Sequence, residues 1–126
     1  MENNHIHEIY HTIEDTFDYL GKKWSIKIIK GFFCHCIHFK DFLEMNPDLS
    51  SKVLSERLKE LEQKGIIEKR VINSSPVQTE YHLTVKGGKL NRIIYEFFMF
   101  AAETTENPSE EFNLQLKEEL EDLFQV

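Results

Sequence analysis

The segment from residue 49 to residue 67 constrains the fold more than any other part of the chain. Apolar side chains recur along it at helical spacing, at Leu54, Leu58 and Leu61. Ser50 and Ser51 precede this run and Gly65 follows it. A serine hydroxyl can accept a hydrogen bond from a free N–H group of a first helical turn, and glycine commonly ends a helix. The pattern predicts a helix that buries its leucine face in a core.

The other face of this helix combines small hydroxyl groups with charged groups. Its members are Ser50, Ser51, Lys52, Ser55, Glu56 and Lys59. Lysine side chains can neutralise phosphates, and serine hydroxyls can reach base edges in a major groove. We therefore predict a DNA-recognition helix, although charges on a helix are more often only solvated.

Two short extended runs follow the helix, at residues 66–72 and 79–84, and a polar tip with a proline separates them. β-branched runs on either side of such a tip predict a hairpin. A hairpin attached directly to the end of a recognition helix is a wing. The wing residues expected to contact DNA are Lys69, Arg70, Ser74, Ser75 and Gln78.

Four short motifs occur in a fixed order along residues 11–104: Leu20-Gly21-Lys22-Lys23-Trp24, Phe39-Lys40-Asp41-Phe42, Leu54-Ser55-Glu56-Arg57-Leu58-Lys59-Glu60-Leu61 and Glu80-Tyr81-His82-Leu83-Thr84. In these motifs the chain resembles the HxlR-type branch of the MarR-like winged-helix regulators. The resemblance implies a mainly α fold with a small β-hairpin, that is, a winged helix-turn-helix with terminal dimerisation helices. It also implies a homodimer whose two recognition helices lie about one DNA turn apart, near 34 Å.

The chain departs from the pattern of this family at two places. Many relatives begin the first helix with a Cys-Pro pair, whose cysteine senses oxidants or electrophiles in some members, whereas this chain has His11 and Thr12. Relatives also commonly carry an arginine in the wing where this chain has Gln78. We therefore expect no thiol switch of the usual kind and a weaker contact between wing and DNA.

Apolar periodicity predicts further helices at about 12–20, 23–33, from Phe39 onward, 84–104 and 109–124. We expect one winged-helix domain over residues 1–126, with residues 105–126 as a C-terminal dimerisation helix. The terminal helices carry more large apolar groups than a small winged domain needs, which favours a homodimer interface over simple cover of the domain's own core. The residues expected at that interface are Ile13, Phe17, Ile94, Phe97, Phe98, Phe112, Leu116 and Leu120.

The net charge of −7 is distributed unevenly. Residues 1–49 contribute −3, residues 50–92 contribute +4 and residues 93–126 contribute −8. The predicted recognition helix and wing therefore form the positive block that phosphate binding requires. The acidic C-terminal segment is expected to face away from DNA.

Both cysteines lie in the segment Cys34-His35-Cys36-Ile37-His38, which suggests a metal or redox site. Structural zinc sites usually use two separated pairs with two or more residues inside each pair, and this spacing fits none of those patterns. The favoured interpretation is a turn after the second helix, with one thiol buried as a small hydrophobe. Trp24 is expected in the core. Arg57 is as well suited to an ion pair with Glu80 as to DNA contact.

The leading function is a sequence-specific DNA-binding transcriptional regulator that acts as a homodimer on a palindromic operator. The alternative is a winged-helix protein-interaction module without sequence-specific DNA binding. Catalytic motifs are not recognisable, so we expect neither an enzyme nor a cofactor or metal. No apolar run approaches the roughly 20 residues that cross a bilayer, and the N-terminus lacks a signal-peptide pattern. Expected partners are double-stranded DNA, a second copy and an unknown small-molecule effector, in the cytoplasm and with no membrane.

Overall fold

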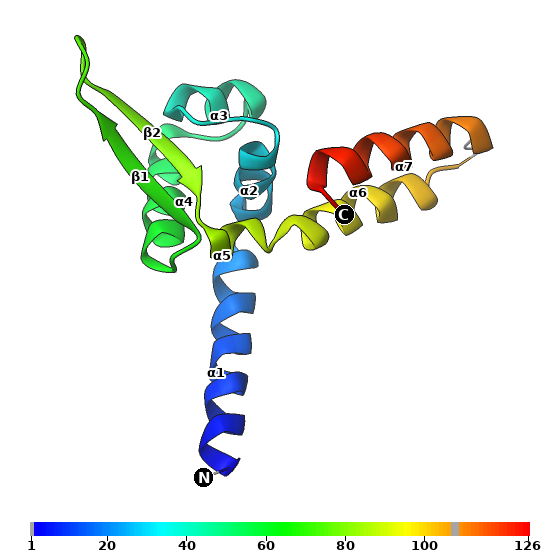
Figure 1. Cartoon of the computed structure of the whole chain (residues 1–126), viewed down its shortest axis with the longest axis horizontal. Helices are drawn as coiled ribbons and strands as arrows, with labels where there is room; N and C mark the ends of the chain where they lie inside the picture. Colours follow the sequence, from blue (N-terminus) through cyan, green and yellow to red (C-terminus); the bar gives the residue numbers. More distant parts are fainter. Residues whose placement is uncertain (1, 107–108) are drawn as a thin grey trace.

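The computed structural model describes residues 2–106 and 109–126, and within them it is mainly helical with one two-stranded antiparallel sheet. In chain order the elements are α1 (Glu2–Leu20), α2 (Ser25–Phe33), α3 (Phe39–Met45), α4 (Ser51–Gln63), β1 (Ile67–Ile72), β2 (Gln78–Leu83), α5 (Val85–Gly88), α6 (Asn91–Glu103) and α7 (Glu110–Phe124). Helices α2, α3 and α4 and the hairpin form the central unit. From this unit α1 projects as one arm and α6 with α7 as another (Figure 1). The expected fold class, a winged helix-turn-helix, is confirmed.

The core of the central unit is formed by the apolar faces of α2, α3 and α4. Phe42 of α3 is fully buried, and its ring lies 4.7 Å from the ring of Phe32 on α2. The leucine face predicted for the recognition helix is also buried, at Leu54, Leu58 and Leu61. Burial of a side chain of this size contributes about 1.5–3 kcal/mol, so these contacts fix the orientation of α4.

The turn between α3 and α4 is held by a buried polar side chain. Asn46 is only 4% exposed, and its amide nitrogen donates a hydrogen bond to the backbone oxygen of Phe42 at 2.9 Å. Leu49 is buried beside it, and Ser50 then caps α4 by accepting a hydrogen bond from the backbone N–H of Val53 at 3.2 Å. The turn thus satisfies its own polar groups and sets the angle between the two helices.

The hairpin pairs Ile67 with Leu83 at its base and Ile72 with Gln78 near its tip. At the end of α4, Gly65 adopts a φ of 75°, a conformation that glycine reaches without strain, and the chain turns directly into β1. The backbone N–H of Tyr81 on β2 donates to the carbonyl of Ile37 at 2.7 Å, which attaches the wing to the segment before α3. The base of the wing is therefore fixed, while its tip extends into solvent.

Three boundaries differ from the sequence-based expectation. Helix α1 begins at Glu2 rather than near residue 12, because the spacing of Ile6, Ile9 and Ile13 continues the apolar stripe toward the N-terminus. The helix expected over 84–104 is divided into α5 and α6. Helix α2 begins at Ser25 rather than near residue 23. Trp24 precedes it with a φ of 78° and is only partly buried, rather than within the core as expected. The ammonium group of Lys27 lies 4.8 Å from the Trp24 ring.

Helix α7 folds back along α6 and closes a second part of the core. Phe124 is 2% exposed, and its ring lies 5.4 Å from that of Phe33 on α2 and 5.5 Å from that of Phe98 on α6. The side-chain amide of Asn91 donates to the backbone oxygen of Phe124 at 2.8 Å. Helix α7 thus covers the apolar surface that α2 and α6 of the same chain present to it.

Candidate nucleic-acid interface

Helix α4 presents its polar face to solvent because its leucine face is held in the core. All the residues predicted on that face are exposed: Ser50, Ser51, Lys52, Ser55, Glu56 and Lys59. Neither Lys52 nor Lys59 forms an ion pair with any residue that the structure describes. Their ammonium groups are therefore available to an anionic partner such as a phosphate.

Arg57 lies on the side of α4 and turns toward the body of the protein. Its Nε donates to the backbone oxygen of Lys23 at 2.9 Å. The ion pair with Glu80 that the sequence suggested does not form, because Glu80 instead contacts the imidazole of His82 at 2.8 Å. Arg57 therefore connects the recognition helix to the turn after α1.

The wing residues named from the sequence are all exposed: Lys69, Arg70, Ser74, Ser75 and Gln78. Two of them already have partners within the hairpin. The guanidinium group of Arg70 forms an ion pair with Glu68, and the hydroxyl of Ser74 donates to the backbone oxygen of Pro76 at 2.6 Å. Lys69 forms no ion pair with the described residues, so it is the wing cation most available to a phosphate.

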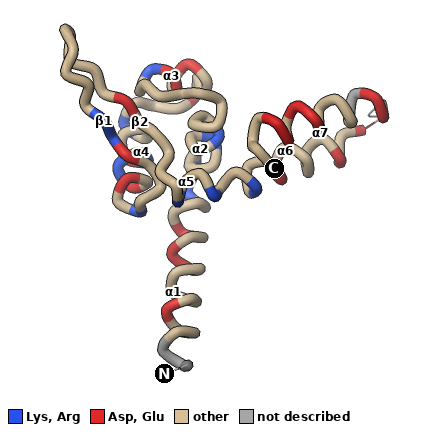
Figure 2. Tube along the Cα trace, in the orientation of Figure 1, with Lys and Arg blue, Asp and Glu red and all other residues tan. Residues whose placement is uncertain are grey.

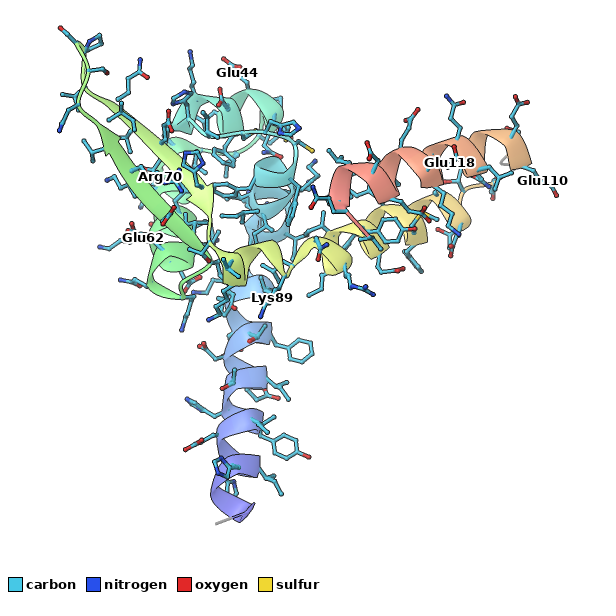
Figure 3. The ribbon with its side chains drawn as sticks, in the orientation of Figure 1. Glu44, Glu62, Arg70, Lys89, Glu110 and Glu118 are labelled. Carbon is cyan, nitrogen blue, oxygen red and sulfur yellow. The ribbon has the colours of Figure 1, made fainter. Side chains whose placement is uncertain are left out.

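The charged groups are separated in space as well as in sequence. Lysine and arginine occur on α4, along β1 and around α5, with acidic groups among them, whereas α6 and α7 carry mainly acidic groups (Figure 2). Arg70 lies on the wing, and Glu110 and Glu118 lie on the distant α7 arm (Figure 3). The excess negative charge of the chain thus lies mainly on α6 and α7, while the region around the candidate recognition helix has an excess of positive charge.

The residues expected at a dimer interface fall into two groups. Ile94 and Leu120 are buried, at 1% and 6% exposed, and Phe98 and Leu116 pack against the same core. These four side chains contribute to the chain's own core, and their place at a dimer interface stays a prediction. Ile13, Phe17 and Phe97 are instead exposed, at 41%, 70% and 56%. The side chain of Phe112 lies outside the described residues.

Sequence reasoning missed part of the exposed apolar surface. On α1 it includes Ile6, Ile9 and Tyr10, and on α6 it includes Ile93 and Phe100. A groove of about 420 Å³ lies between the two helices and is lined mainly by apolar groups, among them Ile13, Phe17, Ile93 and Phe97. The spacing of Ile6, Ile9 and Ile13 along α1 was the available signal in the sequence.

The cysteine segment forms the turn after α2, as the sequence indicated. Cys36 is 6% exposed, and burial raises the pKa of its thiol, with the nearby Asp41 carboxylate acting in the same direction. His35 is exposed and adopts a φ of 70°. Within residues 2–106 and 109–126, no group of three or more His, Cys, Asp or Glu side chains is placed to hold a metal ion. Over the same residues, no helix has the length and apolar character needed to cross a membrane.

Comparison with known proteins relates this geometry to gene regulation. Residues 19–109 match the family model of the HxlR-like helix-turn-helix. The HTH-type transcriptional regulator YodB of Bacillus subtilis is 40% identical over 71% of this chain and 80% of its own length. YvaP of the same organism, described as an uncharacterized HTH-type transcriptional regulator, is 40% identical over 71% of this chain and 83% of its own.

Solved structures lead to the same family. The reduced form of YodB superposes with a TM-score of 0.66 at 38% identity, covering 78% of this chain and 96% of that one. The redox regulator HypR in its oxidized form superposes with a TM-score of 0.69 at 26% identity, covering 75% and 98%. With its recognition helix, its wing and these relatives, the chain belongs to the HxlR-like helix-turn-helix family of transcriptional regulators.

Proposed function

We propose that the protein is a sequence-specific regulator that binds a palindromic operator as a homodimer, with α4 in the major groove and the wing along the adjacent backbone. The observation that carries this proposal is the division of α4 into a buried leucine face and an exposed polar face with two unpaired lysines, Lys52 and Lys59. Ser51 lies directly before Lys52, and Ser55 lies between the two lysines, so both hydroxyls are on the part of α4 where a hydroxyl can meet a base edge.

The dimer part of the proposal rests on the exposed apolar surface of α1 and α6. Five large side chains carry it: Ile9, Ile13, Phe17, Phe97 and Phe100. Burial of a side chain of this size against a partner contributes about 1.5–3 kcal/mol, which is the scale that a stable dimer needs. Two-fold symmetry would then give each operator half-site its own recognition helix. We propose that this exposed surface of α1 and α6 forms the dimer interface, rather than the buried residues on α6 and α7.

The solved structures of the relatives give a reason to expect an effector. Solved structures of YodB include a quinone-bound form, and those of HypR include oxidized and reduced forms. We propose that binding of a small molecule changes the DNA affinity of this protein too, without oxidation of its cysteines.

The proposal is tested by selecting genomic fragments with the purified protein and sequencing those that bind. We expect a two-fold symmetric site. Lys52→Ala and Lys59→Ala should each lower affinity and flatten the log–log salt dependence by roughly one to two units per dimer, because each lysine is present twice. Ser51→Ala and Ser55→Ala should change base preference more than the salt slope.

The matched control is Lys117→Ala, which removes the same charge from α7, far from the candidate interface. If the selection enriches no site and the four α4 variants bind like the native protein, α4 is not the DNA interface. That result would favour the alternative, a winged-helix module that binds another protein.

A further inference from the structure

The C-terminal end of α4 is the point at which both arms of the molecule are attached. Lys64 is the residue that caps this end of the helix. Its ammonium group forms an ion pair with Asp15 of α1 at 2.7 Å, and its backbone oxygen accepts a hydrogen bond from the ammonium group of Lys86 on α5 at 2.7 Å. One residue at the end of the recognition helix thus contacts α1 and the helix that leads into α6.

Neighbouring contacts strengthen both attachments. Lys22, which follows α1, forms an ion pair with Glu60 of α4 at 2.5 Å. Thr84 donates its hydroxyl hydrogen toward the carbonyls of Gly65 and Ile66, at 2.5 Å and 3.1 Å, which anchors the start of α5. In Figure 1 both arms leave the central unit beside α5.

The two ion pairs are distinctive in their reach. They join residues 49 and 38 positions apart, whereas every other ion pair between described residues joins positions at most four apart. The side chains of Lys64 and Asp15 are 33% and 42% exposed, and those of Lys22 and Glu60 are 46% and 23% exposed. An ion pair with this exposure changes an equilibrium by only about two- to five-fold, so neither pair is needed to keep the core folded.

Such contacts do suffice to favour one direction of an arm over others. Helix α1 is a single helix that projects away from the central unit, and its N-terminal part is exposed (Figure 1). The direction of α1 is therefore determined near its C-terminal end, where Asp15 lies. Because the side chain of Lys64 reaches α1 and the side chain of Lys22 reaches α4, the two ion pairs together favour one angle between α1 and α4.

We propose that four residues form a joint between α1, which is an arm of the proposed dimer interface, and the recognition helix α4: Asp15, Lys64, Lys22 and Glu60. The joint sets the angle between these two helices, and so sets the spacing of operator half-sites that the dimer accepts. These are positioning residues, since the proposed base and phosphate contacts are made by other side chains of α4. This inference rests on the proposed homodimer. In that dimer the α1 helix of each protomer is held against the other protomer. The angle between α1 and α4 therefore fixes the distance and the rotation between the two α4 helices.

The test compares DNA duplexes that carry two copies of the selected half-site at different separations. Adding or removing one base pair moves a half-site by about 3.4 Å and rotates it by roughly 35°, which a rigid dimer should reject. The double variant Asp15→Asn/Glu60→Gln removes both ion pairs from each protomer. With four pairs lost per dimer, each worth a factor of about two, the preference for the native spacing should fall roughly fifteenfold. Binding to a duplex with one half-site should stay unchanged.

A matched control is available on the same two helices. Glu14→Gln/Glu62→Gln makes the same change of charge, and neither side chain forms an ion pair with a described residue. This control should keep the native preference. The double variant Asp15→Lys/Lys64→Glu reverses the charges of one ion pair. It should restore most of the preference for the native spacing that Asp15→Lys alone loses. Such recovery also shows that the loss in Asp15→Lys comes from positioning and not from loss of folding.

Sedimentation of the native protein separates failure of the joint from failure of the proposed function. If the native protein is a dimer that prefers one spacing, and Asp15→Asn/Glu60→Gln keeps that preference or changes it no more than the control does, the joint is refuted and the dimeric regulator stands. If the native protein is a monomer, or binds all spacings equally, the proposed palindrome binding fails and the joint fails with it.

Discussion

Two adjacent glycines in α5 offer a sharp test of how this small helix is packed. A Cβ atom added at Gly87 would lie 2.0 Å from the backbone oxygen of Ile66 and 3.0 Å from its carbonyl carbon. At Gly88 an added Cβ meets nothing within 4 Å. The added Cβ at Gly87 would also lie 3.0 Å from the Leu83 side chain. The chemical change is the same at both positions, so the difference between Gly87→Ala and Gly88→Ala reports the close packing of Gly87 against Ile66 and Leu83.

The expected magnitude for Gly87→Ala follows from what must move. The Ile66 carbonyl also accepts hydrogen bonds from the backbone N–H and the hydroxyl of Thr84, at 3.0 Å and 3.1 Å. Backbone must shift by about an ångström to relieve the overlap, which costs about 1–3 kcal/mol for overpacking and weakens hydrogen bonds worth about 0.5–1.5 kcal/mol each. We therefore expect the free energy of unfolding to fall by about 3 kcal/mol.

Gly88→Ala should have the opposite sign. Alanine loses less backbone entropy than glycine on folding, so where its Cβ meets no neighbour it should stabilise the protein by about 0.5–1 kcal/mol. Urea and thermal unfolding followed by circular dichroism measure both changes, and the Tm of Gly87→Ala should be lower by roughly 10 °C. If the two variants unfold within about 0.5 kcal/mol of each other, the close approach of α5 to Ile66 is refuted.

Two further predictions concern the dimer and the turn into α3. Phe17→Asp should convert the dimer to a monomer in sedimentation experiments, whereas Val85→Asp, which changes a side chain 85% exposed and outside the α1–α6 surface, should leave a dimer; a dimeric Phe17→Asp protein would exclude this face of α1 from the interface. The backbone N–H groups of His38 and Ile37 donate to the Asp41 carboxylate and hold its pKa below the usual value. A lowered carboxyl pKa stabilises the fold above about pH 4, and this contribution is lost as the pH falls through the lowered value. The free energy of unfolding of the native protein should therefore exceed that of Asp41→Asn by its full amount at pH 6, and the difference should shrink below pH 4. A constant advantage down to pH 2 would contradict this account.

The recognition helix and the wing could be predicted from the sequence because their signals are local. The leucine spacing of α4, its serine cap and its glycine stop are all contained within one short segment. The wing strands follow from two short extended runs and the polar tip between them. Each of these features depends on neighbours in sequence, so periodicity and turn chemistry suffice to find it.

The division of apolar residues between core and surface could not be predicted in the same way. Ile94 and Phe97 lie on one helix and look equally suitable for an interface, yet the first is 1% exposed and the second 56%. The difference depends on where α2 and α7 pack against α6, which is a tertiary property. The break between α5 and α6 did have a local signal in the adjacent Gly87 and Gly88, because glycine is a poor helix former. Its place also goes with the close approach of Gly87 to Ile66, which is a tertiary property.

The structure also bears on whether the protein senses oxidants through its cysteines. The thiolate is the reactive form of cysteine, and burial of Cys36 raises its pKa and so disfavours that form. Its sulfur lies 3.5 Å from where a Cβ on Gly31 would lie, so an added oxygen has little space on that side. We therefore expect mild peroxide or quinone to leave operator affinity within about twofold, in the native protein and in Cys34→Ser/Cys36→Ser alike. Cys34 is less buried, and for that reason the double variant is the proper comparison. A large loss of affinity in the native protein that reductant reverses and that the double variant lacks would show that the turn after α2 is a sensor after all.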